Sequence, residues 1–90
     1  MAIRVHLHPW LDDAGGGQKT VEVAGATIRE CVDRIGAQYP NVRKRILNQE
    51  GEVKSYVVIC RNGRNTYPAE LSEPVEDGDE ISFLFLIDGG

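Results

Sequence analysis

The group with the most distinctive chemistry in this sequence is the C-terminal carboxylate of Gly90, which is preceded by Gly89. A carboxylate is a poor electrophile, so it must enter an enzyme's nucleotide site and become an acyl-adenylate before it reacts. A tail without side chains fits a narrow channel, and glycine lets the backbone adopt whatever φ the channel imposes. The ending therefore indicates a C-terminus that another enzyme activates, with a frayed chain end as the alternative.

Two further groups of polar residues are weaker candidates for a metal site. His6 and His8 share one face of a predicted strand, but no third ligand stands at a suitable spacing. The acidic residues within 76–80 lack the twelve-residue calcium-loop pattern, and their Asp-Gly-Asp sequence is typical of a turn. We expect no metal and no bound cofactor.

The two cysteines, Cys31 and Cys60, lie far apart in apolar segments and form no Cys-x-x-Cys motif. They are predicted to be reduced, mostly packing thiols. A nucleophilic site would need a serine or cysteine beside a histidine and a carboxylate, and both histidines are distant in sequence from either cysteine. We therefore expect no enzymatic activity of the chain's own.

Length and composition predict one soluble domain over residues 1–90. The chain is 41 % hydrophobic and 27 % charged, and its net charge of -4 provides no basic field for nucleic acid. Residues 1–7 alternate in polarity instead of forming a signal sequence, and no apolar run approaches a membrane span. The expected location is a reducing cytoplasm.

The elements that would position the C-terminus begin with two alternating strands, at 3–7 and 19–23, which are predicted to form an antiparallel hairpin. Thr27 and Glu30 match a capping box, which predicts a helix of about three turns. Its apolar stripe consists of Ile28, Cys31, Val32, Ile35 and Tyr39. Gly36 within this helix is interpreted as allowing close approach to the sheet.

The second half of the chain is predicted to be mostly strand. Val42 and Ile46 indicate a further helical turn, the run 56–61 a strand, and Asn62-Gly63 a turn before a short strand at Thr66 and Tyr67. Leu71 and Val75 are expected to reach the core from a loop, and the last strand runs from 80 to 87. This order predicts an α+β domain in two layers, a β-grasp, with a mixed sheet on one main helix and a flexible tail at about 87–90.

An anomaly in the last strand predicts a docking surface. Both faces of this strand are apolar, and so are both faces of the strand at 56–61, although a sheet covered on one side should present polar residues to water. The side chains expected on the open face are Val58, Cys60, Leu84 and Leu86. We predict that they form a patch for a protein partner, unless a loop or a second copy of the chain covers them.

Three motifs, taken in order, resemble the ThiS/MoaD family of bacterial and archaeal sulfur carriers over the whole chain. They are the Asn62-Gly63 turn, the sequence Asp77-Gly78-Asp79-Glu80-Ile81 and the Gly89-Gly90 ending. The resemblance implies ATP-dependent adenylation of Gly90 by a ThiF/MoeB-like activating enzyme, and then a C-terminal thiocarboxylate. It also implies tail recognition through Gly89 and Asp88, a sulfur donor such as a desulfurase, and a downstream sulfur-accepting synthase.

Some details within this resemblance bear on the pathway. Residues 15–19 and the segment between Tyr39 and Tyr56 look more like carriers for cysteine or related sulfur metabolites than like the shorter thiazole carriers. The residues 85–88 depart from the molybdopterin branch, which usually has proline or small residues before Gly-Gly. The alternatives are a ubiquitin-like modifier joined through Gly90 to a lysine, and a non-catalytic synthase subunit or interaction domain.

Overall fold

The computed structural model describes residues 2–7 and 20–86 of the chain. In this part the order of elements is β1 (Ala2–His6), β2 (Thr20–Ala24), α1 (Ile28–Gln38), α2 (Pro40–Ile46), β3 (Val57–Arg61), β4 (Arg64–Asn65), the 3-10 helix η2 (Glu70–Ser72) and β5 (Glu80–Phe85). The predicted order of strands and helix is confirmed, and the further helical turn proves to be a second α-helix. None of the helices in the described ranges is long and apolar enough to cross a membrane.

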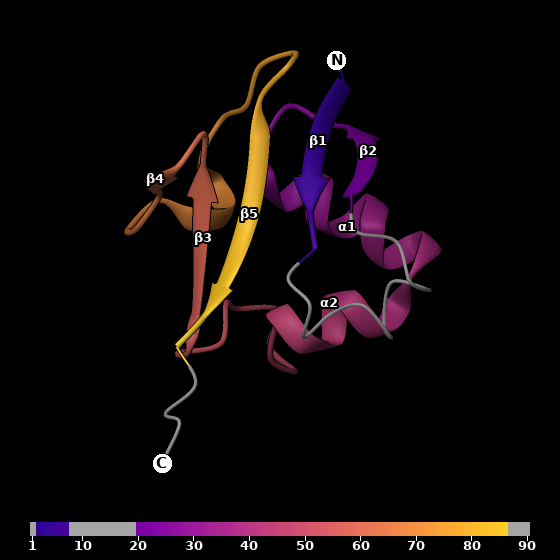
Figure 1. The fold of residues 1–90 in the computed structure, drawn as a ribbon. Helices are drawn as coiled ribbons and strands as arrows, with labels where there is room; N and C mark the ends of the chain where they lie inside the picture. The colour runs from indigo at the N-terminus through magenta and orange to yellow at the C-terminus, as the bar shows by residue number, and fades with distance from the viewer. Residues whose placement is uncertain (1, 8–19, 87–90) are drawn as a thin grey trace.

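The five described strands form one mixed sheet in the order β2-β1-β5-β3-β4. The neighbouring strands β1 and β5 are parallel although they come from opposite ends of the chain, and the other pairs are antiparallel. Figure 1 shows β5 in the middle of the sheet, with the β1–β2 hairpin on one side and β3 and β4 on the other. This is the predicted β-grasp.

Helix α1 begins where the capping box predicts it. The Thr27 hydroxyl accepts a hydrogen bond from the Glu30 N–H at 3.3 Å, and the Glu30 carboxylate accepts one from the Ala26 N–H at 3.0 Å. The helix ends before Pro40, which disfavours helical geometry at Tyr39 and occupies the first turn of α2.

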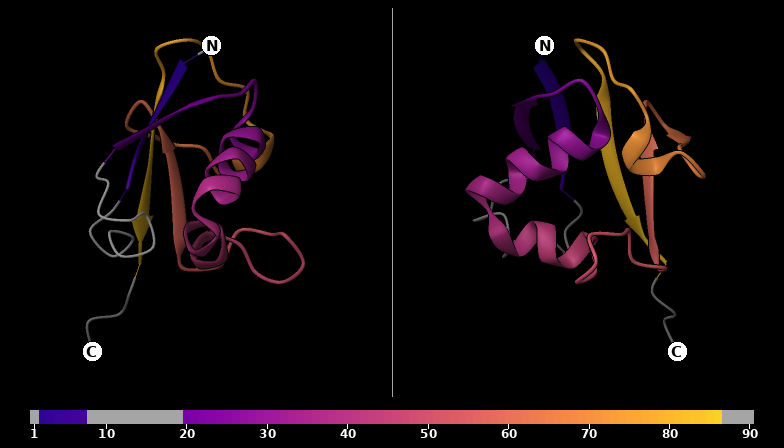
Figure 2. Two further views of the ribbon diagram at one scale, coloured as in Figure 1. Left: turned by 90° about the vertical axis from the view of Figure 1, so that its right-hand side faces the viewer. Right: turned by 180° about the vertical axis from the view of Figure 1, so that it is seen from behind.

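The core lies between the helices and one face of the sheet. Both helices lie on the same side of the sheet, and within residues 2–7 and 20–86 no helix covers its opposite face, which is called the open face below (Figure 2). The four buried α1 positions are the predicted ones, and Leu71 and Val75 also reach the core as expected. Every second side chain along the strands completes the core, including Ile3, Val5, Ile59, Ile81 and Phe83. Burial of each such side chain contributes about 1.5–3 kcal/mol before entropy losses.

Two local expectations were wrong. The short strand after the Asn62-Gly63 turn is Arg64–Asn65, because a two-residue turn pairs Arg61 directly with Arg64. Gly36 allows close approach of α2, not of the sheet: a Cβ atom there would lie 2.7 Å from Cδ and 2.9 Å from Cβ of Arg43.

Candidate functional site

The base of the C-terminal tail is held at the end of β5. The Leu86 N–H donates a hydrogen bond of 2.7 Å to the Tyr56 carbonyl, and Phe85 pairs with Val57 on β3. Asp88, Gly89 and Gly90, the predicted recognition and attachment residues, lie outside the described residues, so their roles remain predictions. The tail therefore starts from a fixed strand end at one edge of the open sheet face.

The predicted docking patch lies on this open face, with one exception. Leu84 is 48 % exposed and Leu86 64 % exposed, and Val58, which pairs with Leu84, is half-buried. Cys60 is only 7 % exposed, so its expected exposure was wrong. Whether the remaining three side chains bind a partner stays a prediction.

The burial of Cys60 follows from its position in the sheet. Cys60 pairs with Ser82 on β5 and with Asn65 on β4, so a strand flanks it on both sides. Because β4 has only two residues, no β4 residue pairs with Val58 in the described register. The apolar patch thus consists of Val58, Leu84 and Leu86 and lies towards the tail.

The other end of the open face is polar. His6 Nε2 lies 2.6 Å from a carboxylate oxygen of Glu80, and its Nδ1 lies 3.3 Å from the Thr20 hydroxyl. Both ring nitrogens are therefore engaged by neighbours within the protein. Among the described residues no group of three or more side chains could hold a metal ion, and His8 lies outside that range.

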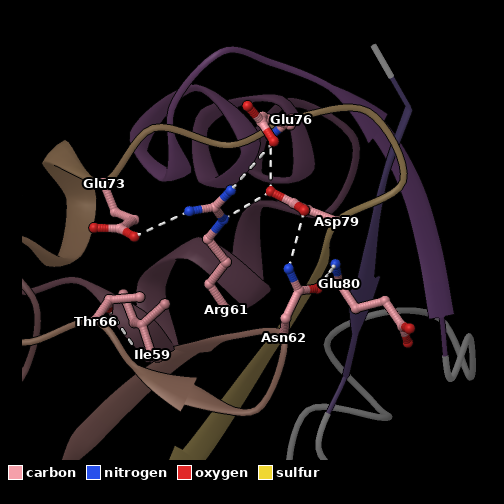
Figure 3. A network of polar contacts seen from close by, with 8 residues as sticks. All are labelled: Ile59, Arg61, Asn62, Thr66, Glu73, Glu76, Asp79 and Glu80. Carbon is pink, nitrogen blue, oxygen red and sulfur yellow. Dashed lines mark hydrogen bonds and ion pairs between the residues drawn. The ribbon is translucent and has the colours of Figure 1, made fainter.

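A cluster of ion pairs centred on Arg61 ties the end of β3 to the start of β5 (Figure 3). Arg61 donates to Asp79 at 2.7 Å and to Glu73 at 3.3 Å, and it lies 3.9 Å from Glu76. The Glu76 N–H also donates to Asp79, at 2.7 Å. Sequence reasoning missed this role of Arg61, because the carboxylates come from a segment more than ten residues away.

Two of the three motifs behind the resemblance meet in this cluster. The Asn62 side chain donates to Asp79 at 3.0 Å and accepts from the Glu80 N–H at 2.9 Å. Asn62 and Gly63 have φ values of 52° and 82°, and Gly78 has a φ of 86°, as the two turns require. The Asn-Gly and Gly-Asp-Glu motifs therefore form a structural clamp at the end of the sheet away from the tail.

The clamp shifts the ionisation of its members. The hydrogen bond from Asn62, followed by those from the Glu76 N–H and Arg61, holds the pKa of Asp79 below its ordinary value, although partial burial opposes the shift. The hydrogen bond to Asp79 likewise raises the pKa of Arg61. Both groups stay charged at neutral pH.

The cysteines are free thiols in the protein interior. Burial raises the pKa of the Cys31 thiol, the neighbouring Glu30 carboxylate adds to this rise, and Arg34 opposes it. A protonated buried thiol is a poor nucleophile. The expectation of packing thiols is confirmed for both cysteines, whereas the exposed position expected for Cys60 on the open face was wrong.

These features define a ubiquitin-like β-grasp protein with an open sheet face beside its C-terminal tail. The model of the ThiS family matches residues 7–90, so the chain belongs to the ThiS family. The predicted family resemblance is thereby confirmed.

Some relatives of this chain are named as modifier proteins and others as sulfur carriers. Small archaeal modifier protein 1 of Haloferax volcanii is 30 % identical over 78 residues, which are 86 % of each chain. Sulfur carrier protein CysO of Mycobacterium tuberculosis is 26 % identical over 93 residues, with both chains fully covered. Among solved structures, the BexX/CysO complex of Amycolatopsis orientalis contains a chain with a TM-score of 0.90 and 27 % identity, covering 99 % of this chain and 100 % of that one. The chain thus resembles both sulfur carriers and ubiquitin-like modifiers.

Proposed function

We propose that the chain is a sulfur carrier whose Gly90 carboxylate is adenylated and then converted to a thiocarboxylate. The observation that carries this proposal is the ThiS family match, which extends through Gly89-Gly90 and includes the whole of β5. The likeness to CysO supports the same role. In this role the chain is a protein co-substrate, and the catalysis belongs to its partners.

The proposed cycle has three partners. A ThiF/MoeB-like enzyme binds ATP and joins AMP to the Gly90 carboxylate with release of pyrophosphate. A sulfur donor such as a desulfurase then supplies the sulfur that displaces AMP. The resulting thiocarboxylate gives its sulfur to a downstream synthase. We predict that this synthase makes cysteine or a related sulfur metabolite. The BexX/CysO complex supports direct docking of such a carrier on a partner protein.

In this proposal the partner enzyme recognises the chain through the open face of the sheet. The exposed Leu84 and Leu86 and the half-buried Val58 form an apolar surface beside the strand end from which the tail continues. A partner that covers this surface would receive the tail in a defined direction. Asp88 and Gly89 would then lie in the partner's channel, where a bulky side chain at position 89 would block entry.

A reconstituted reaction tests the adenylation step. The chain is mixed with the ThiF/MoeB-like enzyme of its own genome and ATP, and pyrophosphate release is measured. We expect release with the native chain and none after deletion of Gly90 or after Gly89→Trp, both of which should keep the unfolding temperature. Equal release by native and truncated chains would refute the proposal.

The second candidate is a ubiquitin-like modifier, and its support is the 30 % identity to small archaeal modifier protein 1. Both functions begin with the same adenylate, but a modifier forms an isopeptide between Gly90 and a lysine of another protein. Denaturing immunoblots of cells that produce the tagged chain separate them. A ladder that disappears on deletion of Gly90 supports the modifier, and a single free band supports the carrier.

A further inference from the structure

The dipeptide Asn62-Gly63 combines two residue types that can react with each other. It is the only Asn-Gly sequence in the chain. Asparagine is one of the thermolabile residues, because a backbone nitrogen can attack its side-chain amide. Glycine favours this attack, since it has no side chain to shield the nitrogen. The turn that the motif forms is therefore also a place where spontaneous deamidation can begin.

Water reaches this dipeptide in the folded chain. Asn62 and Gly63 are both exposed, and they line a hollow of about 310 Å³ together with His6, Glu80 and Ser82. Within the described part of the chain no heavy atom lies within 4 Å of the point where Gly63 would carry a side chain. Neither the attacking nitrogen nor the water that deamidation consumes is thus excluded by packing.

The clamp restrains the amide that would have to react. Asn62 Nδ2 donates to Asp79 Oδ1 at 3.0 Å, and Asn62 Oδ1 accepts from the Glu80 N–H at 2.9 Å (Figure 3). An attacked amide carbon becomes tetrahedral and cannot keep the planar geometry that both hydrogen bonds require. Asp79 is ionised at neutral pH, so it cannot supply the proton that the leaving nitrogen needs. Reaction therefore requires the clamp to open first.

We propose that Asn62 is a deamidation site which the closed clamp protects and whose product prevents the clamp from closing again. The Gly63 nitrogen loses its proton to water and forms a bond to the side-chain carbon of Asn62. The bond from that carbon to Nδ2 breaks, and Nδ2 takes up a proton and leaves as ammonia, which gives a cyclic imide. Water then opens the ring at either carbonyl and leaves aspartate or isoaspartate at position 62. One water is consumed and one ammonia is released.

The product does not fit the closed clamp. Its carboxylate would take the place of an N–H donor that now lies 3.0 Å from Asp79 Oδ1, so two like charges would meet. One guanidinium already balances three carboxylates there, those of Glu73, Glu76 and Asp79. Isoaspartate also lengthens the backbone of a two-residue turn, which breaks the register between Arg61 and Arg64. Deamidation would thus release the start of β5 from the end of β3.

Peptide mapping by mass spectrometry tests the protection. The full chain is incubated in one mildly alkaline buffer, folded or unfolded in guanidinium chloride. We expect Asn62 to deamidate before the internal controls Asn41, Asn48 and Asn65 in the unfolded chain, because a bulkier residue follows each of these. In the folded chain its deamidation should be about tenfold slower or more, since two hydrogen bonds oppose opening. Equal rates in both states, or faster deamidation of another asparagine in the unfolded chain, would overturn the proposal.

A double-mutant cycle tests the effect of the product. Asn62→Asp reproduces the aspartate product, and Asp79→Asn removes the charge that it would face. Denaturant unfolding at neutral pH gives the ratio of folded to unfolded chain for each variant. We expect Asn62→Asp to lower this ratio, and Asp79→Asn to lower it about tenfold less in the Asn62→Asp background than in the native chain. Native stability of Asn62→Asp, or additive effects of the two substitutions, would show that the product leaves the clamp closed and would refute the proposal. Neither experiment involves the tail or a partner enzyme.

Discussion

Replacing the exposed leucines of the open face should weaken binding to the activating enzyme while leaving the fold intact. Full burial of a leucine side chain contributes about 1.5–3 kcal/mol. Leu84 has 48 % of its surface left to bury, so Leu84→Ala should cost about 1 kcal/mol of binding, a roughly fivefold rise in Kd. Leu86 is 64 % exposed, and the double alanine variant should lose about 2.5 kcal/mol, or roughly 60-fold.

Charged substitutions sharpen this test. Leu84→Asp and Val58→Asp each add a carboxylate that the partner would bury, at a cost of about 2 kcal/mol or more. Ala37→Asp is the matched control, because Ala37 is exposed on α1, which packs against the other face of the sheet. Calorimetric titration gives the affinities, and thermal unfolding checks the fold. Native affinity in folded Leu84→Asp and Val58→Asp would refute the docking role and leave the tail as the sole recognition element.

Three further predictions concern the clamp, the tail and the cysteines. Asp79→Asn should destabilise the domain by about 2 kcal/mol at neutral pH. The hydrogen bond from Asn62 contributes most to lowering the pKa of Asp79, so the ionised Asp79 stabilises the fold fully above the unfolded pKa of about 3.9, and this stabilisation is lost as the pH falls through the folded pKa. Denaturant unfolding at several pH values measures the difference in stability between the native chain and Asp79→Asn. A difference that persisted in acid would contradict this assignment. Deletion of Gly90 should leave the urea midpoint unchanged, and a large fall would mean that the tail packs on the domain. Cys31→Ser and Cys60→Ser should retain sulfur transfer whenever they fold, so loss of transfer in a folded variant that still docks would argue against a carboxylate-borne sulfur.

The sequence patterns that predicted the fold correctly are those governed by near neighbours. The capping box fixed the start of α1 because Thr27 and Glu30 act within one turn. The alternation of Ile3 and Val5 identified a core strand because one sheet face is buried. The short strand β4 was wrongly predicted at Thr66 and Tyr67, because the prediction did not apply the rule that a two-residue Asn62-Gly63 turn directly opposes the residues on either side of it.

The features that the sequence did not predict depend on which elements become neighbours in space. Arg61 meets Glu73 and Asp79 only after β3 and β5 pair, so no local pattern marks it. Cys60 is buried because strands flank it on both sides, which requires knowledge of the sheet order. The partner of Gly36 likewise depends on how α2 folds back against α1.

The most direct test of the sulfur-carrier proposal is the intact mass of the chain isolated from its native cells under denaturing, thiol-free conditions. We predict a species in which one oxygen is replaced by sulfur, located by fragmentation at Gly90. This species should be absent when the ThiF/MoeB-like enzyme is deleted. An unmodified terminus in cells that contain the enzyme, together with Gly90 joined to lysines of other proteins, would contradict the carrier function and establish the modifier in its place.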